Sequence, residues 1–160
     1  MSHERCSGLD EATTLEQGLT AWFTRCHRTC DHLWAQVETA VEKGDEGEIV
    51  STTSQFVAKT QKHLQTEEEI LFPMLGQVTG MGSSGPVGVM LAEHEQMKRL
   101  LNLVEEHGQK GNGEQVIDFG DTLLMLTQQH NVKEEQILYP MSEKVLASQW
   151  SELHARLLES

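Results

Sequence analysis

The sequence has few aromatic residues, few basic residues and no long apolar segment. Only 5% of its 160 residues are aromatic, and 12 basic residues stand against 25 acidic ones, which gives a formal net charge of −13. A chain this negative is poorly suited to bind nucleic acid or an anionic membrane surface. No apolar run approaches the ~18 residues that a membrane span requires. We therefore expect neither nucleic acid nor a membrane as a partner.

Cysteine and strand-forming patterns are also scarce. The three cysteines are an odd number and form no disulfide framework, which is typical of a reducing compartment. The polar start, MSHERCSGLDE, lacks the apolar stretch of a signal peptide, so we predict a cytoplasmic protein. No run alternates between apolar and polar residues, which argues against β-strands.

What the sequence does contain is a motif written twice. Residues 63–74 read HLQTEEEILFPM and residues 130–141 read HNVKEEQILYPM. The two copies are 67 residues apart, and the same offset relates His27 to His94. Each half of the chain therefore contains a histidine followed, 36 residues later, by His-x-x-x-Glu.

The spacing within this motif suits a metal site between helices. Residues i and i+4 of an α-helix lie on the same face, so each His-x-x-x-Glu pair can direct an imidazole and a carboxylate toward one point. The two further histidines would come from two further helices, and a four-helix bundle lets all of them meet on its axis. The predicted metal ligands are His27, His63, Glu67, His94, His130 and Glu134.

A single histidine on a helix is more often structural than a ligand, but this set of residues is harder to explain in that way. All six fall on apolar stripes, where a carboxylate is costly to bury unless it is compensated. Mixed imidazole and carboxylate ligands suit iron, zinc or manganese better than calcium or magnesium. With Glu67 and Glu134 as bridges, the set describes a non-haem site of two iron ions, also joined by an oxo or hydroxo group.

The predicted fold is all-α: an up-down-up-down four-helix bundle, with a short C-terminal tail helix, in a single domain over residues 1–160. We expect a loose arm over 1–10, bundle helices over about 13–43, 46–72, 86–107 and 114–139, and a tail helix over about 143–158. The Gly/Ser-rich residues 76–85 would join the two halves. Pro73 should end or bend the second helix, and Tyr139, beside Pro140, falls at the expected end of the fourth.

The other histidines and the cysteines are weaker candidates. His32 has polar helical neighbours and is expected at the surface, and His154, in the tail, is expected to be solvated. Cys30 lies one turn beyond His27 on the same stripe, so its sulfur either approaches the metal site or packs as a small apolar group. Cys26 is open to the same two interpretations.

These motifs resemble the hemerythrin-like, or HHE cation-binding, family of four-helix bundles. The segments EEEILFPML and GMGSSGPVGVMLAEHEQMKRLLNL are more narrowly similar to the di-iron domain of the repair-of-iron-centres proteins, and the likeness covers about residues 15–145. It implies that the four histidines at 27, 63, 94 and 130 are terminal ligands and that Glu67 and Glu134 bridge the two irons.

The chain departs from the family pattern at two places. Oxygen-carrying members have a fifth histidine where Met90 stands, and the repair proteins take a fifth histidine from the region after the first helix. This chain offers only Asp45, Glu46 and Glu48 there. One iron would therefore lack a protein ligand. Either solvent or an external ligand fills the position, or that ion is labile.

The resemblance implies a protein that binds or responds to O₂, NO or iron, with a role in repairing iron centres under nitrosative or oxidative stress. Its partners would be a small diatomic ligand or peroxide, and iron–sulfur proteins as clients. Two alternatives stay open, a di-iron enzyme that reduces peroxide or NO, and a metal-storage or structural bundle.

Overall fold

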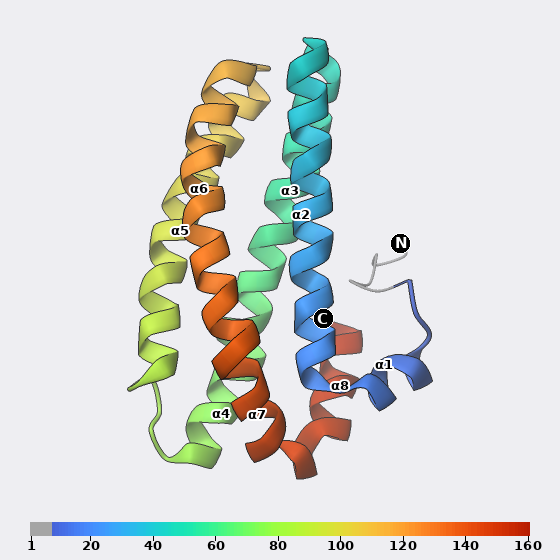
Figure 1. The fold of residues 1–160 in the computed structure, drawn as a ribbon, viewed down its shortest axis with the longest axis vertical. Coiled ribbons are helices and arrows are strands. Elements are labelled where there is room, and N and C mark those ends of the chain that lie inside the picture. The colour runs from blue at the N-terminus through green and yellow to red at the C-terminus, as the bar shows by residue number, and fades with distance from the viewer. Residues whose placement is uncertain (1–7) are drawn as a thin grey trace.

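The structure, a computed structural model that describes residues 8–160, is a bundle of four long helical rods (Figure 1). The described residues form helices and no strand. Rods that follow one another in the sequence pack side by side. The connections between them are short, so successive rods are antiparallel. The up-down-up-down prediction is therefore confirmed. The rods are built on α2 (Leu19–Lys43), α3 (Glu46–Thr66), α5 (Pro86–Gln109) and α6 (Gly113–Lys133).

The second and fourth rods each contain a wider turn and extend beyond their predicted ends. α3 passes through the π-helical turn η1 (Glu67–Leu71) into α4 (Phe72–Thr79). α6 passes through η2 (Glu134–Leu138) into α7 (Tyr139–Val145).

Proline explains where these wider turns fall. Pro73 and Pro140 lie in the first turn of α4 and α7, and a proline in a regular helix interior would remove a hydrogen bond and clash with the preceding turn. In each π turn the backbone N–H just before the proline bonds to a carbonyl five residues back instead. The two helices therefore continue, although Pro73 was expected to end or bend the first of them.

The first and last helices of the described residues lie beside the lower part of the bundle (Figure 1). The predicted first helix is interrupted at Gly18, whose φ of 93° suits glycine, so that α1 (Glu11–Gln17) precedes α2 as a separate helix. The tail forms the 3₁₀ turn η3 (Ala147–Gln149) and α8 (Trp150–Glu159). Most of the predicted N-terminal arm lies outside the described residues.

His154 shows how closely these ends pack. Its Nε2 lies 2.8 Å from Oγ1 of Thr14 in α1, and Nε1 of Trp150 donates to the backbone oxygen of Leu15 at 2.8 Å. His154 is only 4% exposed. The prediction of a solvated His154 is therefore wrong, because α8 packs onto α1 rather than standing in solvent.

The core consists of two apolar clusters with a polar layer between them. One cluster fills the end of the bundle near α4, α7 and α8 and includes Phe23, Leu71 and Leu138. The other fills the opposite half and includes Trp34 and Leu101. The predicted ligands lie along each rod between these clusters, so the bundle itself shields them from solvent.

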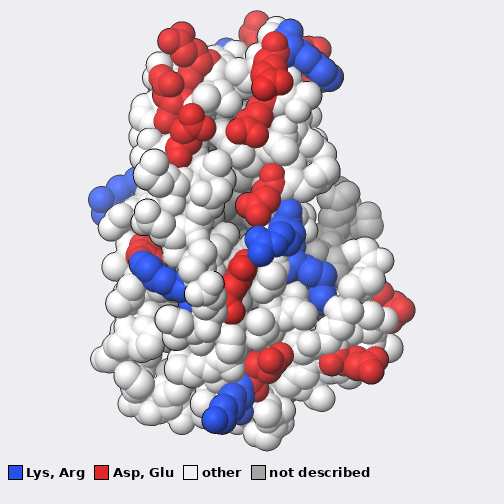
Figure 2. Space-filling view, in the orientation of Figure 1, with Lys and Arg blue, Asp and Glu red and all other residues white. Residues whose placement is uncertain are grey.

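The surface reflects the acidic composition. Figure 2 shows acidic side chains scattered over the visible face, with several gathered at the end of the bundle away from α4 and α7. None of the helices over residues 8–160 combines the length and apolarity needed to cross a bilayer.

Candidate metal centre

All six predicted ligands meet in the middle of the bundle, where they form two overlapping groups. In each group the donor atoms, one from each residue, lie within 4.8 Å of one another. Two carboxylates are common to both groups, so the arrangement describes two adjacent cation sites with shared carboxylates. One group is His27, His63, Glu67 and Glu134, and the other is His94, His130, Glu67 and Glu134.

The four imidazoles point their Nε2 atoms inward. The Nε2 atoms of His27 and His63 are 3.1 Å apart, and those of His94 and His130 are 3.3 Å apart. His63 is the most exposed of the four, at only 8%. Each pair of histidines therefore presents two buried nitrogens toward one position on the bundle axis.

Each glutamate reaches both pairs of histidines. Glu67 lies 3.3 Å from Nε2 of His63 through Oε1 and 3.1 Å from Nε2 of His94 through Oε2. Glu134 places Oε1 at 2.9 Å from Nε2 of His130 and 3.3 Å from Nε2 of His27. A carboxylate that contacts donors of two adjacent sites has the arrangement of a bridging ligand.

The outward nitrogens of three of these histidines are held by further carboxylates. Nδ1 of His27 lies 2.8 Å from Oε1 of Glu135, and Nδ1 of His94 lies 3.0 Å from Oε1 of Glu68. Nδ1 of His130 lies 2.8 Å from Oε2 of Glu93. A carboxylate on Nδ1 favours the tautomer with its proton there, which leaves the lone pair of Nε2 free to face a cation.

Basic side chains orient these outer carboxylates in turn. Arg28 lies 3.1 Å from Glu135, Lys98 lies 2.8 Å from Glu68, and Lys133 forms an ion pair with Glu93. The three outer carboxylates were not among the predicted site residues. A signal was present, because each is the immediate sequence neighbour of a predicted ligand: Glu68 follows Glu67, Glu93 precedes His94 and Glu135 follows Glu134.

The protein alone does not fully compensate the two buried glutamates. Burial, with Glu67 close by, raises the pKa of Glu134 well above its ordinary value. Burial acts on Glu67 in the same direction, but the imidazoles of His63 and His94 hold its pKa well below the ordinary value. The side chains by themselves thus favour one ionised and one protonated carboxylate.

The donor set fits two metal cations. Oε2 of Glu67 and Oε2 of Glu134 are buried and accept no hydrogen bond within the described part of the chain. Burial, reinforced by His63, lowers the pKa of His27 to about 2, so this imidazole stays neutral and can act as a ligand. Cations would bind these carboxylate oxygens and offset the cost of burying both charges. Imidazole with carboxylate suits iron, zinc or manganese.

Tyr139 joins the first group, although it was expected at a helix end. It is fully buried. Its hydroxyl donates to Glu67 and lies 3.1 Å from Nε2 of His27 and 3.1 Å from Oε1 of Glu134. Burial and the two carboxylates raise the pKa of this phenol well above its ordinary value. The centre therefore contains a third type of polar donor.

The π turn explains why the sequence pattern missed Tyr139. In a regular α-helix a residue five positions after Glu134 would be rotated by about 140° from it. In η2 the N–H of Tyr139 bonds to the carbonyl of Glu134, so the wider turn returns residue i+5 to the same face. Helical spacing of three or four residues could not indicate this position.

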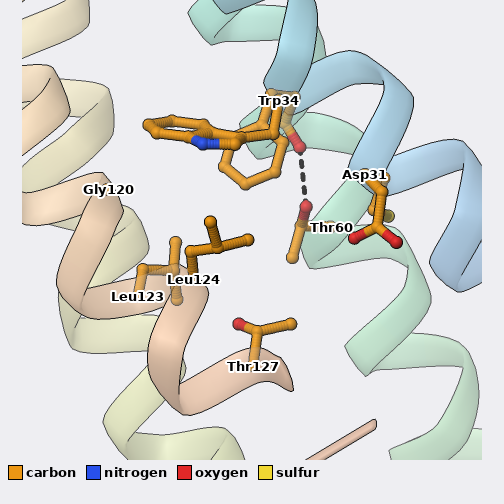
Figure 3. A pocket seen from close by; sticks show the side chains of 9 residues that line it. Asp31, Trp34, Thr60, Gly120, Leu123, Leu124 and Thr127 are labelled. Atoms are coloured by element: carbon orange, nitrogen blue, oxygen red, sulfur yellow. Dashed lines mark hydrogen bonds between the residues drawn. The ribbon is translucent and has the colours of Figure 1, made fainter. Parts of the chain in front are cut away.

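A small pocket lies between α2, α3 and α6 (Figure 3). Three of its lining residues lie one helical turn from a predicted ligand, on the side away from α4 and α7. Cys30 follows His27 by three residues, and Thr60 and Thr127 precede His63 and His130 by three. The remaining lining is mainly apolar, with Asp31 at its edge, and comprises Asp31, Trp34, Phe56, Gly120, Leu123 and Leu124. Cys30 thus lines this pocket and belongs to neither metal group among the described residues.

The tight contact between α2 and α6 shapes this pocket. A Cβ atom at Gly120 would lie 1.9 Å from Cη2 of Trp34, so only glycine leaves room for the indole ring. Within the described residues, Nε1 of Trp34 is buried without a hydrogen-bond partner. The pocket is therefore apolar except for its threonines, Cys30, Asp31 and this indole N–H.

The acidic residues after α2 do not replace the fifth histidine. Asp45 caps α3 by accepting a hydrogen bond from the backbone N–H of Glu48 at 3.0 Å, and the Glu48 carboxylate lies 3.5 Å from Lys43 at the far end of the bundle. Met90 packs in the apolar cluster near α4. His32 is exposed, as expected, and lies 3.1 Å from Gln36.

Comparison with known proteins gives a family and several relatives that share one name. The hemerythrin HHE cation-binding domain matches residues 18–142. Iron-sulfur cluster repair protein YtfE from Yersinia pestis (strain Pestoides F) is 34% identical over 58 residues, which cover 36% of this chain and 26% of that protein. The protein of the same name from Yersinia pseudotuberculosis serotype O:1b (strain IP 31758) gives the same values. No solved structure gives a significant match.

Proposed function

The chain belongs to the hemerythrin HHE cation-binding domain family, and from this premise we propose that it holds two iron ions and binds or responds to O₂ or NO. The observation that carries the proposal is the pair of buried groups that share Glu67 and Glu134. His27 and His63 would hold one ion, and His94 and His130 the other.

The iron ions would supply redox chemistry and affinity for diatomic ligands, and the protein side chains would prepare the site. Glu135, Glu68 and Glu93 hold the outward nitrogens of three histidines. The fixed imidazoles then need little rearrangement when a cation binds. The two apolar clusters on either side exclude bulk water, which strengthens every electrostatic contact inside the centre.

The pocket one turn above the centre supports the choice of a small ligand. It is lined mainly by apolar groups, and three of its residues lie one turn from His27, His63 and His130. Such a lining favours uncharged molecules of a few atoms over charged metabolites. We assign the pocket as the route by which O₂ or NO approaches the irons.

A role in iron-centre repair is supported by the name of the relatives. The match to the two iron-sulfur cluster repair proteins spans about a quarter of their length. The similarity therefore concerns one segment of those proteins. We propose that the shared segment contributes an iron centre, with iron–sulfur proteins under oxidative or nitrosative stress as the clients.

Metal analysis combined with visible spectroscopy tests the proposal. Protein produced in iron-replete cells should contain about two iron ions per chain and change its spectrum when the reduced form meets O₂ or NO. His27→Ala should lose iron, whereas His32→Ala, on the same helix but at the surface, should keep it. A single ion per chain, or zinc alone, contradicts the di-iron proposal.

A further inference from the structure

The two halves of the centre are related by the internal repeat, and they differ at one aromatic position. The offset of 67 that relates the predicted ligands also relates Phe72 to Tyr139. Both residues directly follow a π turn that begins at a shared glutamate. Both are buried, at 3% and 0% exposure. The repeat therefore places a benzene ring in one half and a phenol in the other.

The rings occupy matching places in the two halves. The ring of Phe72 lies 5.5 Å from that of His94 at an interplanar angle of 35°, and the ring of Tyr139 lies 5.5 Å from that of His27 at 34°. The two halves of the backbone thus present the same aromatic position to the centre. Only in the half with His27 and His63 does the residue at this position, Tyr139, carry a hydroxyl oxygen.

That oxygen lies among the donor atoms of its half. It is 3.1 Å from Nε2 of His27 and 3.1 Å from Oε1 of Glu134, and it contacts Glu67. These separations match the 3.1 Å between the Nε2 atoms of His27 and His63. A cation equidistant from those imidazoles and carboxylates would also be within reach of the phenol oxygen.

We propose that the phenol oxygen of Tyr139 is a ligand of the metal ion held by His27 and His63, while the ion held by His94 and His130 has no such ligand. The inference rests on the proposed function, because it requires that a metal be bound. As the metal–oxygen bond forms, the hydroxyl proton leaves to solvent and the electron pair stays on oxygen. Tyr139 thereby replaces the missing fifth histidine, and the position beside Phe72 stays open for an external ligand.

The chain contains a single tyrosine, which makes a decisive test available in the unmodified protein. The ferric protein should show a visible charge-transfer band, and excitation into that band should enhance phenolate ring vibrations. Ring-deuterated tyrosine, supplied during expression, should shift those vibrations, and the signal can arise only from residue 139. A ferric protein with about two irons per chain and no such vibrations would overturn the inference.

Two matched variants extend the test. Tyr139→Phe should abolish the band and weaken one of the two metal positions by roughly tenfold or more, since even outer-shell contacts affect affinity by that factor. Phe72→Tyr places the same phenol in the other half and should increase the band. A band that survives in Tyr139→Phe would overturn the assignment.

Iron content separates the two proposals. A chain that binds no iron contradicts the proposed function, and this inference with it. A chain that binds two irons without tyrosine ligation contradicts only the inference.

Discussion

Nδ1 of His27 lies 2.8 Å from Oε1 of Glu135, a residue 108 positions later in the chain. The same contact recurs in the other half, where Nδ1 of His94 lies 3.0 Å from Oε1 of Glu68. Both carboxylates immediately follow a shared glutamate. Each π turn thus supplies two consecutive acidic residues, one directed at the centre and one at the back of a histidine from another rod.

Removal of an outer carboxylate should weaken metal binding without removing a ligand. We predict that Glu135→Leu lowers iron affinity by about 10- to 100-fold, because the His27 ring loses the group that fixes its orientation and tautomer. Competition with a chelator measures the effect. Glu106→Leu is the matched control, since Glu106 is exposed and forms an ion pair with Lys110, away from the centre. Equal affinities for Glu135→Leu and the wild type would contradict this role.

Acid should destabilise the metal-free protein through His27. The pKa of this buried imidazole is lowered to about 2, whereas in the unfolded chain it is about 6.5. Between these values the unfolded state binds the extra proton, so this contribution to stability is complete above pH 6.5 and is lost as the pH falls. The loss is about 1.4 kcal/mol per pH unit within the window.

A variant isolates this contribution from other titrating groups. Glu134, whose pKa is raised, acts in the opposite direction, because its contribution is lost as the pH rises. We therefore predict that the difference in unfolding free energy between the wild type and His27→Gln, both with chelator, shifts by roughly 1 kcal/mol between pH 6 and pH 5 against the wild type. His32→Gln should leave the pH dependence unchanged. A constant difference for His27→Gln would refute the assignment.

The bundle and the six converging side chains could be predicted from the sequence, because both depend on regular helical periodicity. His63 and Glu67 are four residues apart, and four residues bring them to one face in any α-helix. The internal offset then extended the pattern from the second rod to the others. His27 could be preferred to His32 because only one of them has a partner 67 residues later.

The features that were missed depend on departures from that periodicity or on contacts between rods. Tyr139 reaches the centre only through a π turn, which spacing rules for an α-helix do not describe. The approach of Glu135 to His27 depends on how two rods face each other, and the burial of His154 depends on where α8 packs. The residue pattern along one helix does not indicate how that helix packs against another, so neither contact could be predicted.

Gly120 should be intolerant of any side chain. A Cβ atom there would lie 1.9 Å from the ring of Trp34, so Gly120→Ala forces two packed helices apart despite the better helix propensity of alanine. We predict a loss of roughly 1–3 kcal/mol in the free energy of unfolding, measured with urea. Gly47→Ala is the control, since a Cβ there comes no closer than 3.5 Å to another side chain and should stabilise α3 by about 0.5–1 kcal/mol. Equal effects of both substitutions would argue against this close packing.

Filling the pocket should slow the access of ligand to the irons. We predict that Thr127→Phe decreases the rate at which O₂ or NO changes the spectrum of the reduced protein several-fold, with unchanged iron content. Thr127 lines the pocket, whereas Thr122, on the same helix, is exposed, so Thr122→Phe should react at the wild-type rate. Stopped-flow mixing measures both. An unaffected rate in Thr127→Phe would exclude this route.

The two shared glutamates should respond in opposite ways when each is replaced in the metal-free protein. Because the pKa of Glu134 is raised, its ionised form costs stability as the pH rises, so Glu134→Gln should melt no lower than the wild type at neutral pH. The pKa of Glu67 is lowered by His63 and His94, so its ionised form contributes stability at neutral pH. Glu67→Gln should therefore melt at a lower temperature.

Bound metal should make the wild type the most stable of the three proteins. Iron at a thousandfold excess over its Kd should stabilise the wild type by about 4 kcal/mol. Both Gln variants should gain less, because each lacks one carboxylate that would otherwise contact both ions. Thermal melts of the three proteins, with chelator and with iron, measure these changes. If the wild type melts at the same temperature in both conditions, or if the two metal-free variants shift in the same direction, the electrostatic account of the shared glutamates is refuted.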